Sequence, residues 1–287
     1  MASNQSDGPR IGVALGSGAA RGLTHIPYIE AMDELGLRPS VIAGCSIGAL
    51  IGAGWANGMT GKDLREHAFG ALGSLQLIAG RLWTTGLANF NLEAGLSMQV
   101  DPVIITKAFL PDGFPDDFAE LDTPFHVVAT DLRSWEEVVF ASGPLQQAIA
   151  ASIAIPSLFH PVEVDKRLFI DGGVTNPLPL DIANRDVDLL VGIDVNGSPD
   201  ERFATGVPSA FETGFLATQI MSHMLISNMV ELQQPHVYVR PEVNPFGILE
   251  FWRVREILDH VAGGKDDFKR QLSDRVEAWE KGAVTAS

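Results

Sequence analysis

Hydrophobic residues in the first sixty positions predict two successive strand–helix units. Residues 10–15 (RIGVAL) have the pattern of a buried strand, a glycine-rich turn follows at 16–22, and apolar residues at helical spacing then predict a helix to about Leu35. A short strand at 41–43, a second tight turn and a helix over 47–57 repeat this order. The repeat predicts parallel strands joined by right-handed crossovers.

Beyond residue 58 the pattern becomes irregular and then regular again. Residues 58–122 mix Gly, Leu, Trp and Phe without a clean period, which predicts an insertion of helices and loops. The later elements are predicted as strands at 125–130, 138–141, 189–195 and 236–240, a hairpin over 162–170 that turns at Asp165-Lys166, and helices near 144–152, 211–232 and 250–281. We therefore expect one α/β domain over residues 10–287, with a helical insertion at about 58–122 and a helical C-terminal part at about 206–287.

Composition and charge narrow the classes of partner. Apolar residues make up 46% of the 287, and a chain of this length buries about three quarters of its unfolded surface, so a large core needs no crosslink. The formal net charge is −16 at pH 7. Because such an acidic surface repels phosphate backbones and anionic bilayers, we expect no nucleic acid partner and at most transient membrane contact.

Cysteine usage and the apolar stretches bear on compartment and metals. A single cysteine, Cys45, excludes an intrachain disulfide and a Cys-based zinc site. No close cluster of His and Asp suggests a metal, so neither metal nor cofactor is expected. The N-terminus lacks the regions of a signal peptide, and the longest apolar stretch, residues 41–56, is too short to span a bilayer. We expect a soluble, cytoplasmic protein.

The turn after the second predicted strand has the form G-x-S-x-G, with Gly44, Ser46 and Gly48. Between a strand and a helix this pattern makes a nucleophile elbow, in which small residues two positions on either side of the serine avoid a clash. The helix that follows directs its N-terminal N–H groups at developing negative charge. Ser46 is therefore a candidate nucleophile, and the alternative is a plain strand-to-helix turn.

The first glycine turn, GSGAARG, also joins a strand to a helix and has two interpretations. A dinucleotide cradle requires G-x-G-x-x-G and an acidic residue about 20 positions on, whereas the spacing here is G-x-G-x-x-x-G and the next unit ends in the serine elbow. An oxyanion hole instead requires backbone N–H groups that face a tetrahedral intermediate. The candidate residues for the hole are Gly16, Ser17, Gly18 and Ala19. Arg21 would orient this loop, bind an anionic head group or form a surface salt bridge.

A candidate base follows the predicted hairpin. Asp171 comes directly after an apolar strand, and the adjacent Gly172 and Gly173 permit close approach of another loop. An aspartate in this position either accepts a proton from Ser46 or caps a turn.

A Ser-His-Asp triad is the alternative to a serine paired with aspartate alone. The chain has seven histidines, and none of the late ones lies in a glycine-flanked loop. The elbow also comes too early in the chain for the strand order of an α/β-hydrolase. His25 falls in the middle of a predicted helix, where a packed core histidine is more common than a catalyst. The sequence disfavours a triad without excluding it.

Together the three motifs resemble the bacterial branch of the patatin-like phospholipase family. The resemblance spans residues 10–195 and includes three further segments, ATDL at 129–132, ASIAIPSLFHPV at 151–162 and FIDGGVTNPLP at 169–179. One departure is Ser17, where many members have a third glycine. Because an oxyanion hole uses backbone N–H groups, this departure has little consequence for the expected site.

The resemblance implies a fold, a mechanism and a substrate class. The fold is a three-layer α/β sandwich with a mainly parallel central sheet flanked by helices. The mechanism uses a dyad of Ser46 and Asp171, an oxyanion hole from the first glycine turn, and no calcium. Substrates in the family are lipid or other acyl esters, cleaved by phospholipases A, lysophospholipases and esterases. A catalytically idle lipid-binding or regulatory scaffold on the same fold is the competing interpretation, and a nucleotide-binding module is a third.

An acyl chain requires an apolar channel, for which two sets of residues are candidates. The set in the insertion is Leu75, Leu77, Ile78, Leu82, Trp83, Leu87 and Phe90. The set on the later helix is Met221, Met224, Leu225 and Met229. The alternatives for both sets are ordinary core, a homodimer surface or a shallow membrane-contact patch.

Overall fold

A computed structural model describes residues 8–73, 101–198 and 210–282, and eight strands in these ranges form one sheet. The strands are β1 (Ile11–Leu15), β2 (Val41–Cys45), β3 (Phe125–Asp131), β4 (Glu137–Phe140), β5 (Val162–Val164), β6 (Arg167–Asp171), β7 (Leu189–Ile193) and β8 (Val237–Val239). Their order across the sheet is β5-β6-β3-β2-β1-β7-β8, with β4 also paired to β3.

The centre of the sheet is parallel and one side is antiparallel. Strands β3, β2, β1, β7 and β8 run parallel to one another, whereas β4 and β6 pair antiparallel with β3 and β5 pairs antiparallel with β6. The carboxyl ends of β2 and β1 therefore lie at the same edge of the sheet. Because Asp171 pairs in register with Ala129 of β3, antiparallel β6 also ends near this edge.

Helices of both α and 3₁₀ type connect the strands. The α-helices are α1 (His25–Glu34), α2 (Ile47–Ala56), α3 (Gly61–Leu72), α5 (Pro102–Phe109), α6 (Leu145–Ser152), α7 (Leu180–Ala183), α8 (Ala210–Gln233), α9 (Val254–His260) and α10 (Gly264–Glu280). The 3₁₀ helices are η1 (Ala19–Thr24), η4 (Phe118–Glu120), η5 (Gly172–Val174) and η7 (Phe251–Arg253).

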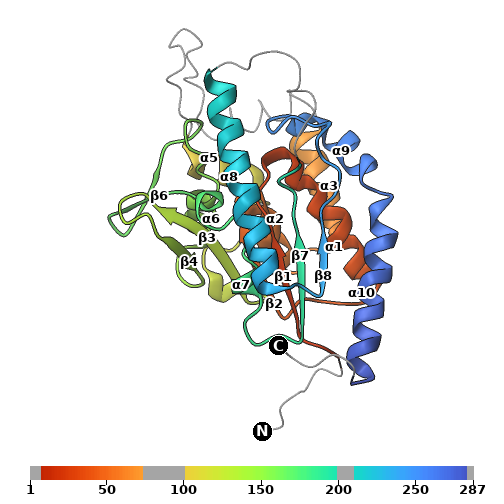
Figure 1. Ribbon diagram of the computed structural model, residues 1–287. Helices are drawn as coiled ribbons and strands as arrows, with labels where there is room; N and C mark the ends of the chain where they lie inside the picture. The colour runs from red at the N-terminus through yellow and green to blue at the C-terminus, as the bar shows by residue number, and fades with distance from the viewer. Residues whose placement is uncertain (1–7, 74–100, 199–209, 283–287) are drawn as a thin grey trace.

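Side-chain alternation along the central strands produces two apolar faces, each covered by helices. On one face Val13 of β1 belongs to the same buried cluster as Ile29 of α1, together with residues of α2, α3, α9 and α10. On the other face Ala14 packs in a cluster with Leu180 of α7 and Ile226 of α8. Figure 1 shows the resulting layers, with α7 and α8 on one side of the sheet. The predicted α/β sandwich with a flanked, mainly parallel centre is confirmed.

Most predicted elements are present, and one long helix is wrong. The hairpin turns at Asp165-Lys166 as expected, and residues 58–122 contain α3 and α5. The helix predicted over 250–281 is divided into η7, α9 and α10, with a break at residues 261–263, which end in Gly263. Glycine adjacent to a helix end lowers the cost of leaving the helix. In the described part of the chain no helix is both long and apolar enough to cross a bilayer. The domain boundaries stay a prediction.

Candidate active site

Ser46 occupies a strained turn between β2 and α2. Its backbone has φ 55° and ψ −123°, a left-handed conformation that is costly for a residue with a side chain. The flanking glycines explain how the turn is tolerated. A Cβ at Gly48 would lie 2.2 Å from the carbonyl oxygen of Leu15, and one at Gly44 would lie 2.6 Å from the carbonyl oxygen of Gly48. The G-x-S-x-G pattern thus reflects steric limits on both sides of the serine.

The Ser46 hydroxyl donates to Asp171 at an Oγ–Oδ2 distance of 2.6 Å, although 125 positions separate the two residues. Strand order brings them together, because β2 and β6 are both neighbours of β3. The second carboxylate oxygen of Asp171, Oδ1, accepts from the backbone N–H of Gly173 at 2.7 Å. Both side chains are nearly buried, with Ser46 4% and Asp171 6% exposed.

Burial raises the pKa of Asp171 to about 6, against the weaker opposing effect of its hydrogen bonds to Ser46 and Gly173. A carboxylate with a pKa near 6 is a better match for proton transfer at neutral pH than one with the ordinary value. The site therefore contains a hydroxyl and an adjacent base whose basicity suits general base chemistry.

A third polar side chain, Ser152, supports Ser46 from the end of α6. The Ser46 backbone N–H donates to Ser152 Oγ at 2.8 Å, and the Ser152 side chain is fully buried. This bond satisfies the N–H of a residue in a strained conformation, so Ser152 helps to fix the turn. This role was not predicted from the sequence, where Ser152 belongs to the helix predicted near 144–152 and to the ASIAIPSLFHPV segment.

In the first glycine turn, residues 16–22, here called the glycine loop, some backbone N–H groups form hydrogen bonds within the fold and others do not. Gly16 donates to the carbonyl oxygen of Ile193 at 3.0 Å and Ser17 to that of Pro177 at 2.8 Å, so these two N–H groups are already engaged. Within the described residues, the N–H groups of Gly18 and Ala19 have no hydrogen-bond partner. Both residues line a cavity with Ser46. Of the four predicted residues, Gly18 and Ala19 are thus the ones with N–H groups available for an oxyanion.

Arg21 is buried, so the alternative that placed it on the surface is wrong about its position. Its side chain is 6% exposed and donates through Nε to the carbonyl oxygen of Phe246 at 2.9 Å and through Nη1 to that of Asn196 at 3.2 Å. Both acceptors lie far along the chain. Arg21 therefore connects the glycine loop to two later segments, which agrees with the expected loop-orienting role.

His25 also supports the glycine loop. Burial lowers the pKa of His25 to about 4, so the imidazole is neutral at physiological pH. Its Nε2 lies 2.9 Å from the carbonyl oxygen of Gly16, which identifies Nε2–H as the donor. His25 is thus a buried core histidine, as expected from its place in the sequence. In the described structure none of the seven histidines bonds to the Ser46 hydroxyl, whose partner is Asp171.

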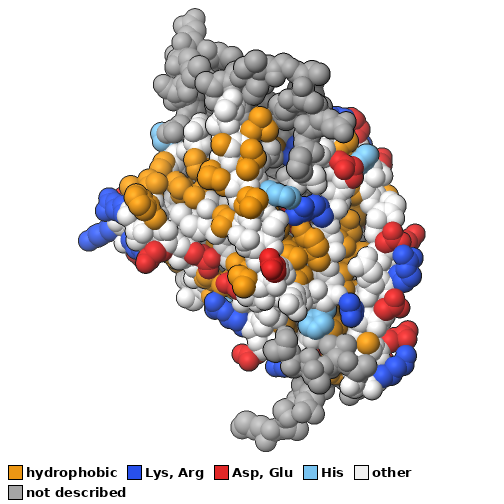
Figure 2. Space-filling view, viewed as in Figure 1, with side chains coloured by type: hydrophobic (Ala, Val, Ile, Leu, Met, Phe, Trp, Pro, Cys, Tyr) orange, Lys and Arg blue, Asp and Glu red, His pale blue; other side chains and the backbone are white. Residues whose placement is uncertain are grey.

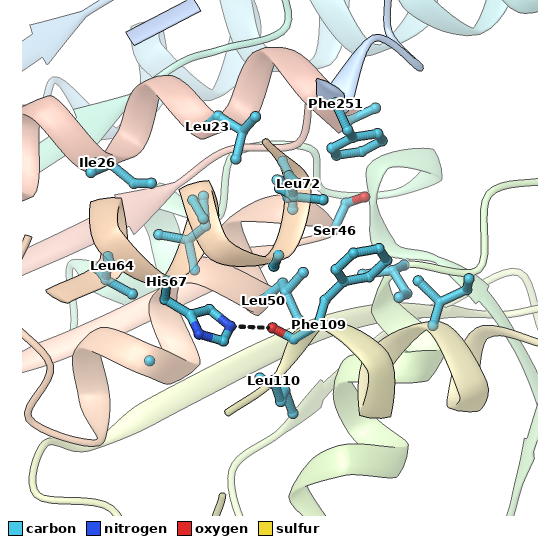
Figure 3. A pocket seen from close by; sticks show the side chains of 18 of the residues that line it. Leu23, Ile26, Ser46, Leu50, Leu64, His67, Leu72, Phe109, Leu110 and Phe251 are labelled. Atoms are coloured by element: carbon cyan, nitrogen blue, oxygen red, sulfur yellow. Dashed lines mark hydrogen bonds between the residues drawn. The ribbon is translucent and has the colours of Figure 1, made fainter. Parts of the chain in front are cut away.

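Two cavities meet at Ser46. The smaller, about 70 Å³, contains Asp171, Gly18 and Ala19 at its surface and is partly polar. The larger, about 290 Å³, is walled almost entirely by apolar side chains, which come from α2, α3 and the end of α5 and also from η1, the segment after α6 and the segment around η7. Figure 3 shows Ser46 at one side of this cavity and His67, which bonds to the Phe109 carbonyl oxygen, across it. The nucleophile candidate thus borders a polar cavity and an apolar one.

Of the two sets predicted for an acyl channel, only the one on the later helix lies within the described residues. The set from Leu75 to Phe90 falls outside the described residues. Met221 and Met224 of α8 are 59% and 56% exposed, and neither they nor Leu225 and Met229 line either cavity. Figure 2 shows hydrophobic side chains on the exposed side of the molecule along which α8 runs. These four residues are therefore wrong as channel walls, although Thr218, Gln219 and Ser222 of the same helix line the smaller cavity.

No metal site accompanies these groups. Across residues 8–73, 101–198 and 210–282, no three His, Cys, Asp or Glu side chains converge in a way that could hold an ion. The burial of Cys45 beside Asp171 raises the pKa of its thiol well above the ordinary value, so it is a poor ligand as well as a poor nucleophile.

Known proteins match the chain across these motifs. The sequence profile of the patatin-like phospholipases matches residues 13–184. An uncharacterised NTE family protein of Mycobacterium tuberculosis is 39% identical over 194 residues, which are 67% of this chain and 51% of that protein. Lysophospholipase NTE1 of Kluyveromyces lactis is 24% identical over 98% of this chain and 20% of its own length. This chain thus spans about half the length of the mycobacterial relatives.

Among solved structures, VipD from Legionella pneumophila aligns with a TM-score of 0.45 and 15% identity, over 92% of this chain and 67% of that one. The profile match covers more than half of the sequence and includes the elbow, the glycine loop and the Asp-Gly-Gly turn. The chain therefore belongs to the patatin-like phospholipase family.

Proposed function

We propose that this protein is a serine acyl hydrolase that cleaves carboxylic esters of lipids, with Ser46 as nucleophile and Asp171 as its base. The observation that carries the proposal is the 2.6 Å hydrogen bond from Ser46 Oγ to Asp171 Oδ2 in a site with no imidazole on the hydroxyl. Family membership supports lipid esters as the substrate class. The name lysophospholipase, printed for the yeast relative, supports the same class.

In the proposed first half-reaction, Ser46 Oγ attacks the ester carbonyl while its proton passes to Asp171 Oδ2. The carbonyl oxygen becomes an oxyanion, which the N–H groups of Gly18 and Ala19 stabilise together with the N-terminus of α2. Collapse of this intermediate breaks the ester C–O bond. The departing alcohol takes the proton from Asp171, which leaves an acyl group on Ser46.

In the second half-reaction, water attacks the acyl carbonyl and gives its proton to Asp171. Collapse of the new intermediate breaks the bond to Oγ, releases the carboxylic acid and returns the proton to Ser46. A pKa near 6 lets Asp171 take and return this proton without a large free-energy cost in either direction. The apolar cavity would receive the acyl chain, and the polar cavity the oxyanion.

A fluorophosphonate probe and two substitutions test the proposal. The probe is expected to label Ser46 in the wild type, and Ser46→Ala and Asp171→Asn are each expected to lower ester hydrolysis by about 10⁴-fold or more. Matched controls are Ser134→Ala and Asp165→Asn at exposed turn positions, which should retain wild-type rates. Absence of both labelling and hydrolysis in folded wild type would overturn the proposal in favour of an idle scaffold.

A further inference from the structure

The larger cavity runs alongside two helices, α2 and α3. On α2 the lining residues are Ile47, Leu50, Ile51 and Gly54, which fall on one face of the helix. On α3 the lining residues at the same helical spacing are Leu64, His67, Ala68, Ala71 and Leu72. In Figure 3, Leu72 lies near Ser46, whereas Leu64 lies on the opposite side of the cavity.

The side of the cavity opposite Ser46 lies where α2 is followed by α3. A Cβ added to Gly54 would lie 2.7 Å from Leu64 Cδ2 and 3.2 Å from Met59 Sδ, so these two side chains pack directly against the α2 backbone. Met59 belongs to the connection between the helices and also lines the cavity. A chain that enters from Ser46 along α2 therefore meets Met59 and Leu64 at the far end.

The helices give the length of this cavity. Gly54 comes eight positions after Ser46 on α2, and Leu72 comes eight positions after Leu64 on α3. At about 1.5 Å per residue, each path is about 12 Å long. Carbon–carbon bonds of about 1.52 Å at an angle of about 111° advance an extended chain by about 1.25 Å per methylene. Both path lengths therefore correspond to an extended chain of about ten carbons.

Resting on the acyl hydrolase function proposed above, we infer that this cavity limits the acyl chain and favours esters of about eight to ten carbons, with Met59 and Leu64 setting the limit. Its volume of about 290 Å³ lies at the lower end of the range of ligand sites, which is about 300–1,000 Å³. The wall is apolar, and the one imidazole in it, His67, donates through Nε2 to the Phe109 carbonyl oxygen at 2.8 Å. The described part of the wall therefore offers no hydrogen-bonding partner that would stabilise a polar chain.

Hydrolysis of p-nitrophenyl esters with chains of two to sixteen carbons tests this inference. Wild-type kcat/KM should be highest at about eight to ten carbons and lower by about tenfold or more at sixteen. The variant Leu64→Ala, alone and combined with Met59→Ala, should raise the ratio of sixteen-carbon to eight-carbon activity. The variant Ala68→Leu, which adds volume halfway along α3, should move the optimum to shorter chains. The ratio within one variant is unaffected by a variant's loss of folded protein.

Met224→Ala on exposed α8 is the matched control and should leave the chain-length profile unchanged. A wild-type preference for sixteen carbons, or a profile that Leu64→Ala and Ala68→Leu both leave unmoved, would overturn the inference while the esterase function stands. Absence of hydrolysis for every ester, with no fluorophosphonate labelling, would overturn the proposed function instead.

Discussion

The Gly173 N–H donates to Asp171 Oδ1 at 2.7 Å, two residues after the carboxylate that it holds. The bond leaves the other oxygen, Oδ2, for the Ser46 hydroxyl, so each carboxylate oxygen has its own partner. Glycine suits this turn, because a Cβ at position 173 would lie 3.0 Å from Oδ1 and 3.2 Å from Ser17 Oγ. The Asp-Gly-Gly sequence therefore orients a buried carboxylate and permits close contact with the glycine loop.

Activity should depend on the ionisation of Asp171. Only the carboxylate form can accept the Ser46 proton, and burial raises the pKa of Asp171 to about 6. We expect kcat/KM for a soluble ester to fall tenfold per pH unit below about pH 6 and to be level above it. Rates measured from pH 4.5 to 8.5 check this, with Asp165→Asn as a control of unchanged profile. A midpoint close to 4 would contradict the expected effect of burial.

The same group should make the fold less stable as pH rises. The pKa of Asp171 is about 6 when folded and 3.8 as an unperturbed group, so between these values the folded state binds more protons and its stability falls with increasing pH. The free energy of unfolding is lowered by the full amount, about 3 kcal/mol, above pH 6. We expect Asp171→Asn to be more stable than wild type at pH 8, by up to that amount, and to lose this advantage toward pH 4.

Urea denaturation of both proteins at pH 4.5 and pH 8 measures this difference, and Asp165→Asn at an exposed turn provides the comparison. An Asp171→Asn variant that is destabilised equally at both pH values would show that the carboxylate is needed for packing rather than held at a cost. Together with the rate profile, the result would separate the catalytic and structural contributions of this residue.

Local sequence patterns predicted the strands and the elbow, because their causes are local. Apolar runs at β1, β2 and β7 mark strands buried on both faces, and the positions of Gly44 and Gly48 follow from steric limits within one turn. The helix α3 was missed as a distinct element within the insertion. A signal for it was present, since Thr60 and Asp63 form a capping box at its start.

Contacts between distant parts of the chain could not be predicted in the same way. The burial of Arg21 depends on carbonyl groups of Asn196 and Phe246, and the support of Ser46 depends on Ser152. The local pattern made Asp171 a candidate base or a turn cap, and the family resemblance implied its pairing with Ser46. The exposure of Met221 depends on which side of α8 packs against the sheet, and apolar residues around the whole helix do not indicate that side.

Arg21 should act as a positioning residue for the glycine loop. Arg21→Met removes two donors and leaves the carbonyl groups of Phe246 and Asn196 without them, which should cost about 1–3 kcal/mol of folding free energy. Because Gly18 and Ala19 adjoin this residue, we also expect kcat to fall more than KM changes. Arg21→Lys should not restore kcat, since an ammonium group lacks the planar fork that reaches two separate acceptors.

Thermal unfolding and ester kinetics at a temperature where each variant is folded distinguish the two effects. The exposed substitution Arg133→Met is the control and should change neither. A variant Arg21→Met with lowered stability and an unchanged kcat would show that Arg21 holds the later segments without positioning the loop.

Substitution by alanine should change the stability of the protein in opposite directions at Gly48 and at Gly70. Both lie in helices, but a Cβ at Gly48 would be 2.2 Å from the Leu15 carbonyl oxygen, whereas one at Gly70 would have nothing within 4 Å. Gly70→Ala should raise stability by about 0.5–1 kcal/mol, because alanine has the higher helix propensity and no clash opposes it. Gly48→Ala forces α2 away from β1, so it should lower stability and displace Ser46, with loss of hydrolysis. Urea denaturation and fluorophosphonate labelling measure both effects, and equal stability changes at the two positions would contradict the steric account of the elbow.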